Sequence, residues 1–354
     1  MNNKSFLNQN ILIVGGAGFV GSNLCLKLIE ESPNKIIIVD NLLSSEVSNI
    51  PNNEIVDFRY GSITDDSILE SLPDNLDYVF HLSCYHGNQS SIANPLADHE
   101  NNTLTTLKLF ERLINIKNLK KVVYAAAGCA VAEKTYGEAS ATTEDAPISL
   151  FHDSPYSISK IVGEFYGNYY YTSHGLPFVK ARFQNVYGPR EILGAGQWRG
   201  TRHTVWRNVT PTFIFKSLLG ESLPLDNEGK VSRDFIFVED MARGLMAAAL
   251  NGEPGEAYNL ASGVETTIRE LAETINQISG NIAPVILNPA RNWDRSGCRY
   301  GSTKKSEEVL GFKAKIPLKK GLEKTIRWTK ENSKMIQSYI KQHDYFIEHD
   351  KENL

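Results

Sequence analysis

The sequence has few cysteines, no long apolar run and no strong excess of either charge. Its four cysteines are widely spaced without a CxxC pair, which argues against a zinc site or a disulfide framework. No apolar segment approaches the roughly 20 residues that cross a bilayer, and the polar start MNNKSFLNQN has no apolar signal core. A net charge of −4 is too small to favour nucleic acid or an anionic membrane as the partner. We therefore expect a soluble, cytoplasmic protein without a metal.

Short apolar runs alternate with helical patterns through the first half of the chain. Strands are predicted at ILIV from Ile11, KIIIVD ending at Asp40, EIVDFRY from Glu54, LDYVFHL from Leu76, KKVVYAAA from Lys120 and PFVKARF from Pro177. Helices are predicted at about 19–31, 97–116 and 155–173, and later at 212–219, 238–250, 268–278 and 318–332. Such alternation is typical of a doubly wound parallel sheet covered on both faces, an α/β fold.

The alternation of apolar strands and helical patterns ends after Arg190, which suggests a second, smaller unit. We expect a nucleotide-binding domain at 1–185, with a returning segment near 232–262, and a C-terminal substrate-binding α/β domain at 186–335. A tail is expected at 336–354, with its polar end HDYFIEHDKENL exposed. The Gly- and Arg-rich segment 191–210 is expected to be a long loop.

A glycine-rich turn, GGAGFVG from Gly15, follows the first predicted strand and opens a helix. It satisfies GxGxxG through Gly16, Gly18 and Gly21, and also GxxGxxG through Gly15, Gly18 and Gly21. In this context it predicts a Rossmann-type dinucleotide site at the helix N-terminus. Asp40 ends the second strand, where a carboxylate accepts hydrogen bonds from a ribose diol and repels a 2′-phosphate. The pattern therefore favours NAD over NADP. The alternatives are a tightly packed turn and a strand-end role for Asp40.

A tyrosine and a lysine in SPYSISK, Tyr156 and Lys160, are spaced to share one helix face. A phenol with a pKa of about 10 is a poor base at neutral pH, but a nearby ammonium favours its phenolate form. We expect Tyr156 to remove a proton from a sugar hydroxyl while hydride leaves the same carbon. Lys160 is also expected to donate to the nicotinamide ribose.

These stretches resemble the extended short-chain dehydrogenase/reductase family, specifically its nucleotide-sugar epimerases and dehydratases. The likeness extends from Ile11 to about Trp328 and rests on GGAGFVGSNL, VDNL, VFHLSC, NNTLTTLKLFE, SPYSISK, RFQNVYGPR, SRDFIFVEDMARGL and YNLASG. The resemblance implies NAD as cofactor, a nucleotide-diphosphate sugar as substrate, and a homodimer formed through the helices at 97–116 and 155–173.

The resemblance also assigns site residues. Those expected to bind the cofactor, besides Tyr156 and Lys160, are Gly15, Gly18, Phe19, Val20 and Gly21 at the pyrophosphate, Asp40 and Asn41 at the adenosine ribose, Ser62 and Ile63 at the adenine, and Leu82, Ser83, His86 and Asn102 along the rest. The family usually has aspartate at the Ser62 position, and galactose epimerases have lysine at the His86 position. Asn185, Arg233 and Arg291 are expected to hold the substrate diphosphate, as bidentate arginines suit such groups. For each arginine the alternative is a surface ion pair.

One family feature is missing. Ala127 stands where relatives usually place a serine or threonine that bridges the sugar oxygen and the tyrosine. Gly128 and Cys129 follow, where dehydratases have an Asp-Glu pair, so an ordinary 4,6-dehydratase is disfavoured. Cys129, Thr142, Thr143 or a bound water are the candidates to replace the hydroxyl.

The predicted activity is NAD-dependent epimerisation of a nucleotide sugar through a transient keto-sugar. The alternatives are a dehydrogenase, a decarboxylase or an unusual dehydratase on the same fold, and a catalytically silent NAD- or nucleotide-binding protein. The loop at 191–210 either closes over the sugar or is a solvent loop or subunit contact. The residues expected to act in closure are Trp198, Arg199, Arg202, His203 and Trp206.

Overall fold

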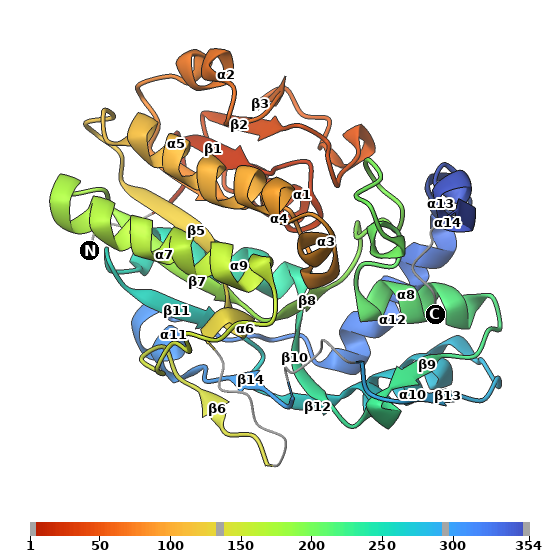
Figure 1. The fold of residues 1–354 in the computed structure, drawn as a ribbon. Coiled ribbons are helices and arrows are strands. Elements are labelled where there is room, and N and C mark those ends of the chain that lie inside the picture. Colours follow the sequence, from red (N-terminus) through yellow and green to blue (C-terminus); the bar gives the residue numbers. More distant parts are fainter. Residues whose placement is uncertain (1–4, 132–137, 292–296, 350–354) are drawn as a thin grey trace.

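A seven-stranded parallel sheet forms the centre of the computed structural model, which describes residues 5–131, 138–291 and 297–349 (Figure 1). In spatial order its strands are β11 (Ala257–Leu260), β7 (Phe178–Phe183), β5 (Lys121–Ala127), β4 (Tyr78–His81), β1 (Asn10–Val14), β2 (Lys35–Asp40) and β3 (Val56–Tyr60). The chain order reverses between β1 and β4, the switch point at which doubly wound sheets bind ligands. The predicted Rossmann-type α/β fold is confirmed.

Both faces of the sheet are buried because its strands are apolar on both sides. Ile11 and Ile13 face one helical layer, whereas Leu12 and Val14 face the other. The first layer contains α1 (Phe19–Ile29), α9 (Val238–Asn251) and α11 (Lys304–Leu310). The second contains α2 (Asp66–Ser71), α5 (Thr105–Leu113) and α7 (Pro155–His174). The carboxyl ends of the strands are left open, and the site is built there.

A second group of elements has a hydrophobic core of its own, around Phe213, Phe235 and Leu271. It contains a three-stranded sheet of β12 (Glu265–Thr267), β10 (Ser232–Phe237) and β8 (Asn185–Tyr187), the strand pair β9 (Pro224–Asp226) and β13 (Ile286–Asn288), and the helices α8 (Val209–Leu218), α10 (Ile268–Ser279) and α12 (Leu318–Glu331). These elements lie beside the large sheet in Figure 1. The domain boundaries given above remain a prediction.

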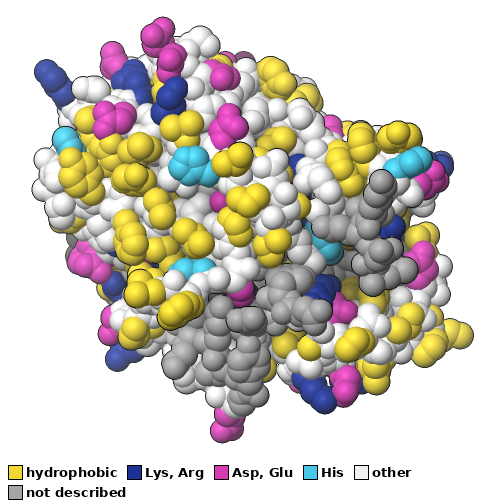
Figure 2. All heavy atoms as spheres, in the orientation of Figure 1, with side chains coloured by type: hydrophobic (Ala, Val, Ile, Leu, Met, Phe, Trp, Pro, Cys, Tyr) yellow, Lys and Arg dark blue, Asp and Glu magenta, His cyan; other side chains and the backbone are white. Residues whose placement is uncertain are grey.

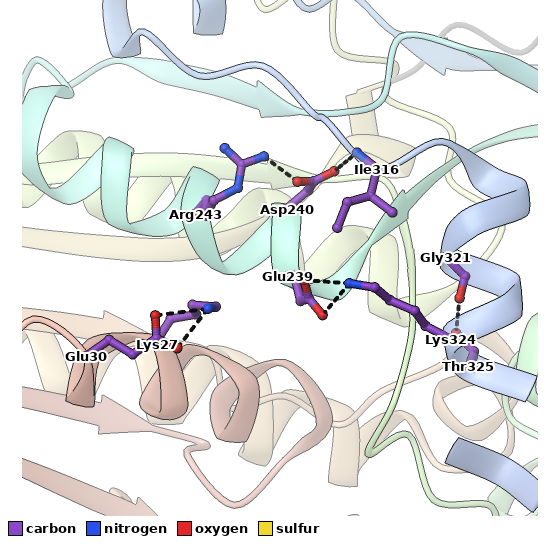
Figure 3. Close-up of polar contacts among 9 residues, drawn as sticks. All are labelled: Lys27, Glu30, Glu239, Asp240, Arg243, Ile316, Gly321, Lys324 and Thr325. Atoms are coloured by element: carbon purple, nitrogen blue, oxygen red, sulfur yellow. Dashed lines mark hydrogen bonds and ion pairs between the residues drawn. The ribbon is translucent and has the colours of Figure 1, made fainter. Parts of the chain in front are cut away.

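Helix α9 connects the two groups (Figure 3). The carboxylate of Asp240 is buried and accepts hydrogen bonds from the backbone amides of Lys315 and Ile316, both at 2.8 Å. Glu239 forms an ion pair with Lys324 of α12 at 3.0 Å. A helix that covers the large sheet is thereby fixed to the chain that leads into α12.

The remaining elements are short. They are η1 (Val47–Asn49), α3 (Asn88–Ala93), α4 (Pro95–Asp98), η2 (His99–Leu104), α6 (Gly128–Val131), β6 (Ala141–Thr142), η3 (Arg202–Thr204), η4 (Asn227–Gly229), β14 (Tyr300–Gly301), α13 (Ser333–Lys341) and α14 (Asp344–His349). Within the described ranges, no helix is both long and apolar enough to cross a membrane.

Two local expectations differ from the structure. The helix predicted at 97–116 is divided into α4, the π-helical stretch η2 and α5. The C-terminal end is not simply an exposed tail, because its described part contains α13 and α14 and buries His343 to 3% exposure. Because this segment is mostly polar, the few side chains that pack against the rest of the protein could not be recognised from its sequence.

Candidate active site

A single cavity of about 700 Å³ opens at the carboxyl ends of the large sheet and extends to the second group of elements. Its lining includes every predicted site residue except Asn102. Segments from both groups of elements therefore meet around one space. The volume falls within the range of small-molecule and cofactor sites.

The glycine-rich turn forms one end of this cavity. Gly15 has φ of +85°, and a Cβ placed on it would lie 2.6 Å from the backbone nitrogen of Ser83. A Cβ on Gly21 would lie 2.2 Å from the carbonyl oxygen of Gly15. Helix α1 begins at Phe19 without a side-chain cap, so its first amides and positive dipole end face the cavity. This cradle fits the pyrophosphate of a dinucleotide.

Asp40 lies at the end of β2 on the same wall. One of its carboxylate oxygens accepts from the amide of Ala17 at 3.0 Å, and the other from the amide of Leu42 and the hydroxyl of Ser45, both at 2.9 Å. Burial raises the pKa of Asp40, and these hydrogen bonds oppose the rise. The carboxylate is thus held in place with acceptor capacity to spare for a ribose diol. Asn41, Ser62 and Ile63 continue the wall beyond it.

Tyr156 and Lys160 both project into the cavity from the first turns of α7. The helix begins with Ser154 as N-cap and Pro155 in its first turn, a combination that fixes where α7 starts. Lys160 is buried, donates to the carbonyl oxygen of Ala125 at 3.0 Å, and lies 5.9 Å from the centroid of the Tyr156 ring. An ammonium at this distance, shielded from water, stabilises a phenolate.

Cationic side chains outnumber carboxylates in the lining of the cavity. Arg233 is buried on β10 and donates to the carbonyl oxygen of Gly297 at 2.6 Å. Arg291 is more exposed and forms an ion pair with Asp226, so it lines the cavity and is ion-paired at once. The basic side chains of the lining are Lys160, Arg190, Arg207, Lys216, Arg233, Arg291 and Arg299, against the carboxylates Asp40, Glu191 and Asp226. An excess of positive charge suits two diphosphate groups.

Comparison with known proteins agrees with this geometry. The family model described as NAD dependent epimerase/dehydratase family matches residues 11–261. This chain belongs to that family. Its NAD cofactor is therefore confirmed, together with the fold.

Three members of the epimerase/dehydratase family are similar to this chain over most of its length. The Bordetella bronchiseptica enzyme WbmF, in a crystal structure with NAD+ and UDP, is 55% identical, with a TM-score of 0.88 over 97% of this chain and 98% of that chain. A putative UDP-glucose 4-epimerase of Methanocaldococcus jannaschii is 32% identical over 92% of this chain and 99% of its own length. UDP-glucuronic acid decarboxylase 6 of Arabidopsis thaliana is 31% identical over 91% of this chain and 89% of its length. The predicted class, an NAD-dependent nucleotide-sugar epimerase and hence an isomerase, is confirmed.

Next to Tyr156, the predicted residue His86 begins a polar chain that runs through Asn208 to the buried Glu191, two residues that sequence analysis missed. The His86 ring lies 6.0 Å from the Tyr156 ring, and its Nε2 is 3.2 Å from Oδ1 of Asn208. The Asn208 amide donates in turn to Glu191. Burial lowers the pKa of His86 to about 4 and raises that of Glu191 to about 7. At neutral pH the imidazole is therefore uncharged, and the second oxygen of Glu191 has no hydrogen-bond partner among the described residues.

Asn102 lies behind the wall rather than in it. Its side chain accepts from the amide of Tyr85 at 2.7 Å and donates to Asp98 at 2.7 Å and to Ser159 at 3.1 Å. These contacts connect η2 to the start of α7. Asn102 is therefore placed to position the helix that carries Tyr156, and direct contact with a cofactor remains a prediction.

The segment 191–210 is largely buried and forms part of the wall. His203 and Trp206 line the cavity. Trp198 instead stacks on Phe346 at 5.2 Å, Arg199 donates to the carbonyl oxygen of His86 at 3.2 Å, and Arg202 donates to that of Ile347 at 3.3 Å. The expectation of a solvent loop is wrong.

Several further lining residues carried no recognisable signal in the sequence. They are Gln184, Glu191, Arg207, Asn208 and Arg299. Gln184 lies within the family stretch RFQNVYGPR and Glu191 directly follows it, so this neighbourhood was the one available clue. Their polar side chains become informative only once the strands are paired.

Proposed function

We propose that this chain interconverts the C4 epimers of a UDP-linked sugar through a 4-keto intermediate. The observation that supports this most is that the phosphate cradle, Tyr156 with Lys160, and the arginine-rich wall share one cavity. A dinucleotide and a nucleotide sugar can thus be held with their reacting ends together. Relatives described with UDP or UDP-sugars support uridine as the base.

The residues at this site suit reversible removal of a proton and a hydride from one carbon. Bound NAD supplies the hydride acceptor and donor. Tyr156 takes the proton from the sugar hydroxyl and returns it, and the buried ammonium of Lys160 stabilises the phenolate between these events. Neutral His86 beside the Tyr156 ring adds no charge that would hold the proton back.

Loss of water from the sugar is a less suitable reaction for this site. A 4,6-dehydratase needs a carboxylic acid and a base beside C5 and C6. At the end of β5, the cavity is lined by Ala125, Ala126 and Ala127, and the carboxylates of the described lining belong to other segments. This arrangement favours return of the hydride over elimination.

The test is turnover of a panel of UDP-sugars in deuterated water, followed by proton NMR. The panel contains UDP-glucose, UDP-galactose, their N-acetylamino forms and UDP-glucuronic acid. We expect the C4 epimer of one substrate without solvent deuterium in the sugar. A 4-keto-6-deoxy product carrying deuterium, a pentose product, or no turnover of any sugar would contradict the proposal.

We also propose that the chain acts as a homodimer paired through α7. Ile158, Phe165 and Tyr169 on this helix are each at least 50% exposed, and Leu96 at its side is 81% exposed. Figure 2 shows hydrophobic side chains gathered over α7 and its neighbours. Exposed apolar side chains gathered on one helix and its neighbour are typical of an interface.

Light scattering after gel filtration tests the homodimer. The wild-type protein is expected at twice the monomer mass, and Phe165→Asp at the monomer mass. Ile282→Asp serves as control, since Ile282 is 99% exposed in the C-terminal half. A monomeric wild-type protein would contradict pairing.

A further inference from the structure

The end of β5 offers no hydroxyl to a substrate. Ala125, Ala126 and Ala127 line the cavity, and Ala127 packs in one apolar cluster with Tyr156. A sugar oxygen that loses its proton to Tyr156 develops negative charge, and a hydrogen-bond donor aimed at that oxygen commonly contributes on the order of a hundredfold in rate. Another segment therefore has to supply the donor at this place.

Neither threonine proposed from the sequence is suitable. Thr142 belongs to β6 and Thr143 follows it, and neither is among the residues that line the cavity. The Thr143 side chain is hydrogen-bonded to Asp145. The side chain of Cys129 lies outside the described part of the structure.

Gln184 does reach the end of β5. In the register of the parallel pair, Ala127 is opposite Phe183, so Gln184 follows β7 at the level where Gly128 follows β5. A Cβ placed on Gly128 would lie 2.3 Å from Nε2 of Gln184, and one on Gly301 would lie 2.9 Å from the same atom. The amide thus fills a slot that exists because both neighbours are glycine.

The Gln184 amide is also available. Its residue lines the cavity, and within the described residues its side chain makes no hydrogen bond. An amide group has two N–H donors, and because Gln184 is half-buried these donors are open to water or to a ligand in the cavity. A bound sugar would supply the missing acceptor.

We propose that the side-chain amide of Gln184 donates a hydrogen bond to the sugar oxygen that Tyr156 deprotonates. This inference rests on the proposed function. In the oxidation the O–H proton goes to Tyr156, the hydrogen on the same carbon leaves as hydride to bound NAD, and the C–O bond becomes C=O. The return step reverses all three changes. Gln184 gains and loses no proton, and it stabilises the negative charge that develops on the oxygen.

The experiment compares Gln184→Leu with the wild-type protein, using the UDP-sugar that turns over in the panel, UDP-galactose first. We expect kcat to fall at least tenfold with little change in KM or in the NAD and UDP affinities measured by calorimetry. The kinetic isotope effect of substrate deuterated at C4 should rise as the chemical step becomes limiting. Gln277→Leu, on the exposed face of α10, is the matched control and should change nothing.

Two further variants separate this role from general damage. Ala127→Ser in the Gln184→Leu background returns a hydroxyl to the end of β5 and should recover most of the lost kcat. Gly301→Ala leaves Gln184 in the sequence but crowds its amide. It should therefore reproduce part of the fall in kcat that is expected for Gln184→Leu.

Three results would overturn the inference. The first is an unchanged kcat in a folded Gln184→Leu protein. The second is a rise in KM alone, which would mean that Gln184 only helps to bind. The third is a kcat that Ala127→Ser does not restore. Failure of the wild-type protein to turn over any sugar would instead contradict the proposed function, and this inference with it.

Discussion

Tyr156 and Lys160 lie one helical turn apart on α7, and the sugar chemistry depends on the phenol. We expect Tyr156→Phe to lower kcat by about 10²–10⁴-fold, the usual contribution of a positioned acid or base. The ring remains, so the affinities for NAD and UDP should stay within a few-fold of the wild-type values. Initial rates and calorimetry measure the two effects.

The matched control is Tyr169→Phe on the same helix. Its side chain is 54% exposed, so the same change there should leave kcat unaffected. Equal losses in both variants would mean that α7 is merely sensitive to substitution.

A second prediction at the residue scale concerns Glu191 and the stability of the protein. Burial raises its pKa from 4.5 to about 7 in the folded protein. Between these two pH values the unfolded chain releases the proton and the folded protein keeps it, so stability falls as the pH rises through this range. The shift corresponds to about 3 kcal/mol at most. Glu191→Gln removes this loss. The free energy of unfolding of the variant, relative to that of the wild type, should therefore be higher at pH 8 than at pH 4.5.

Urea unfolding at the two pH values measures this difference. Glu273→Gln, on the exposed side of α10, is the control and should follow the wild-type pH dependence. The idea fails if Glu191→Gln and wild type lose the same stability between pH 4.5 and 8.

At the scale of elements, α7 approaches the sheet closely through two glycines one turn apart. A Cβ on Gly163 would lie 2.1 Å from the Tyr124 hydroxyl, and one on Gly167 would lie 2.0 Å from the Phe178 ring. Alanine is preferred over glycine in a helix by about 1 kcal/mol, but overpacking a close contact costs roughly 1–3 kcal/mol. We expect the cost of overpacking to exceed the gain in helix propensity, so that Gly167→Ala lowers the free energy of unfolding.

Chemical denaturation measures this effect, and activity gives a second readout. Because α7 carries Tyr156 and Lys160, a displaced helix should also lower kcat. Ser173→Ala, at an exposed position near the end of α7, is expected to behave as wild type. A Gly167→Ala protein of unchanged or higher stability would show that the sheet yields easily to the added methyl group.

The same elements show how far the sequence alone could lead. The turn GGAGFVG, Asp40 at the end of β2, and the pair Tyr156 and Lys160 were predictable because each has a local pattern tied to a strand or helix end. The π-helical stretch η2 was not, because Asn102 forms its contacts with Tyr85 and Ser159, far away in the chain.

Gln184 escaped prediction for a similar reason. It meets Gly128 only through the register of β5 and β7, and Gly301 only through the return of β14. A polar side chain within a family stretch has no assignable chemical role until its spatial neighbours are known. Side chains set by pairing between distant segments are therefore the part of the site that required the structure.

At the scale of the whole molecule, the C-terminal helices support the active-site wall. Ile336 of α13 packs with Ile192 and Leu193, the beginning of the segment 191–210. The buried His343 ring contacts the carbonyl oxygen of Gly194 at 2.9 Å. The same segment supplies Trp206 and Asn208 to the cavity. The last helices thus hold in place a segment that lines the cavity.

We therefore predict that a protein ending at Lys341 folds but binds its substrate less well. Loss of the contacts to Gly194 and of the Trp198–Phe346 stack should loosen 191–210, raising amide hydrogen exchange there and raising KM about tenfold, the equivalent of roughly 1.4 kcal/mol. Exchange within β1 and β4 should not change.

Single substitutions in the complete chain locate the effect. Phe346→Ala removes the ring that stacks on Trp198 at 5.2 Å, whereas Tyr345→Ala changes its neighbour, which is 67% exposed. We expect Phe346→Ala to raise exchange in 191–210 and to raise KM in the same direction as the truncation, and Tyr345→Ala to do neither. Equal KM values in the truncated and complete proteins would mean that 191–210 holds its place without the C-terminal helices, because its own packing against Phe215 of α8 is sufficient.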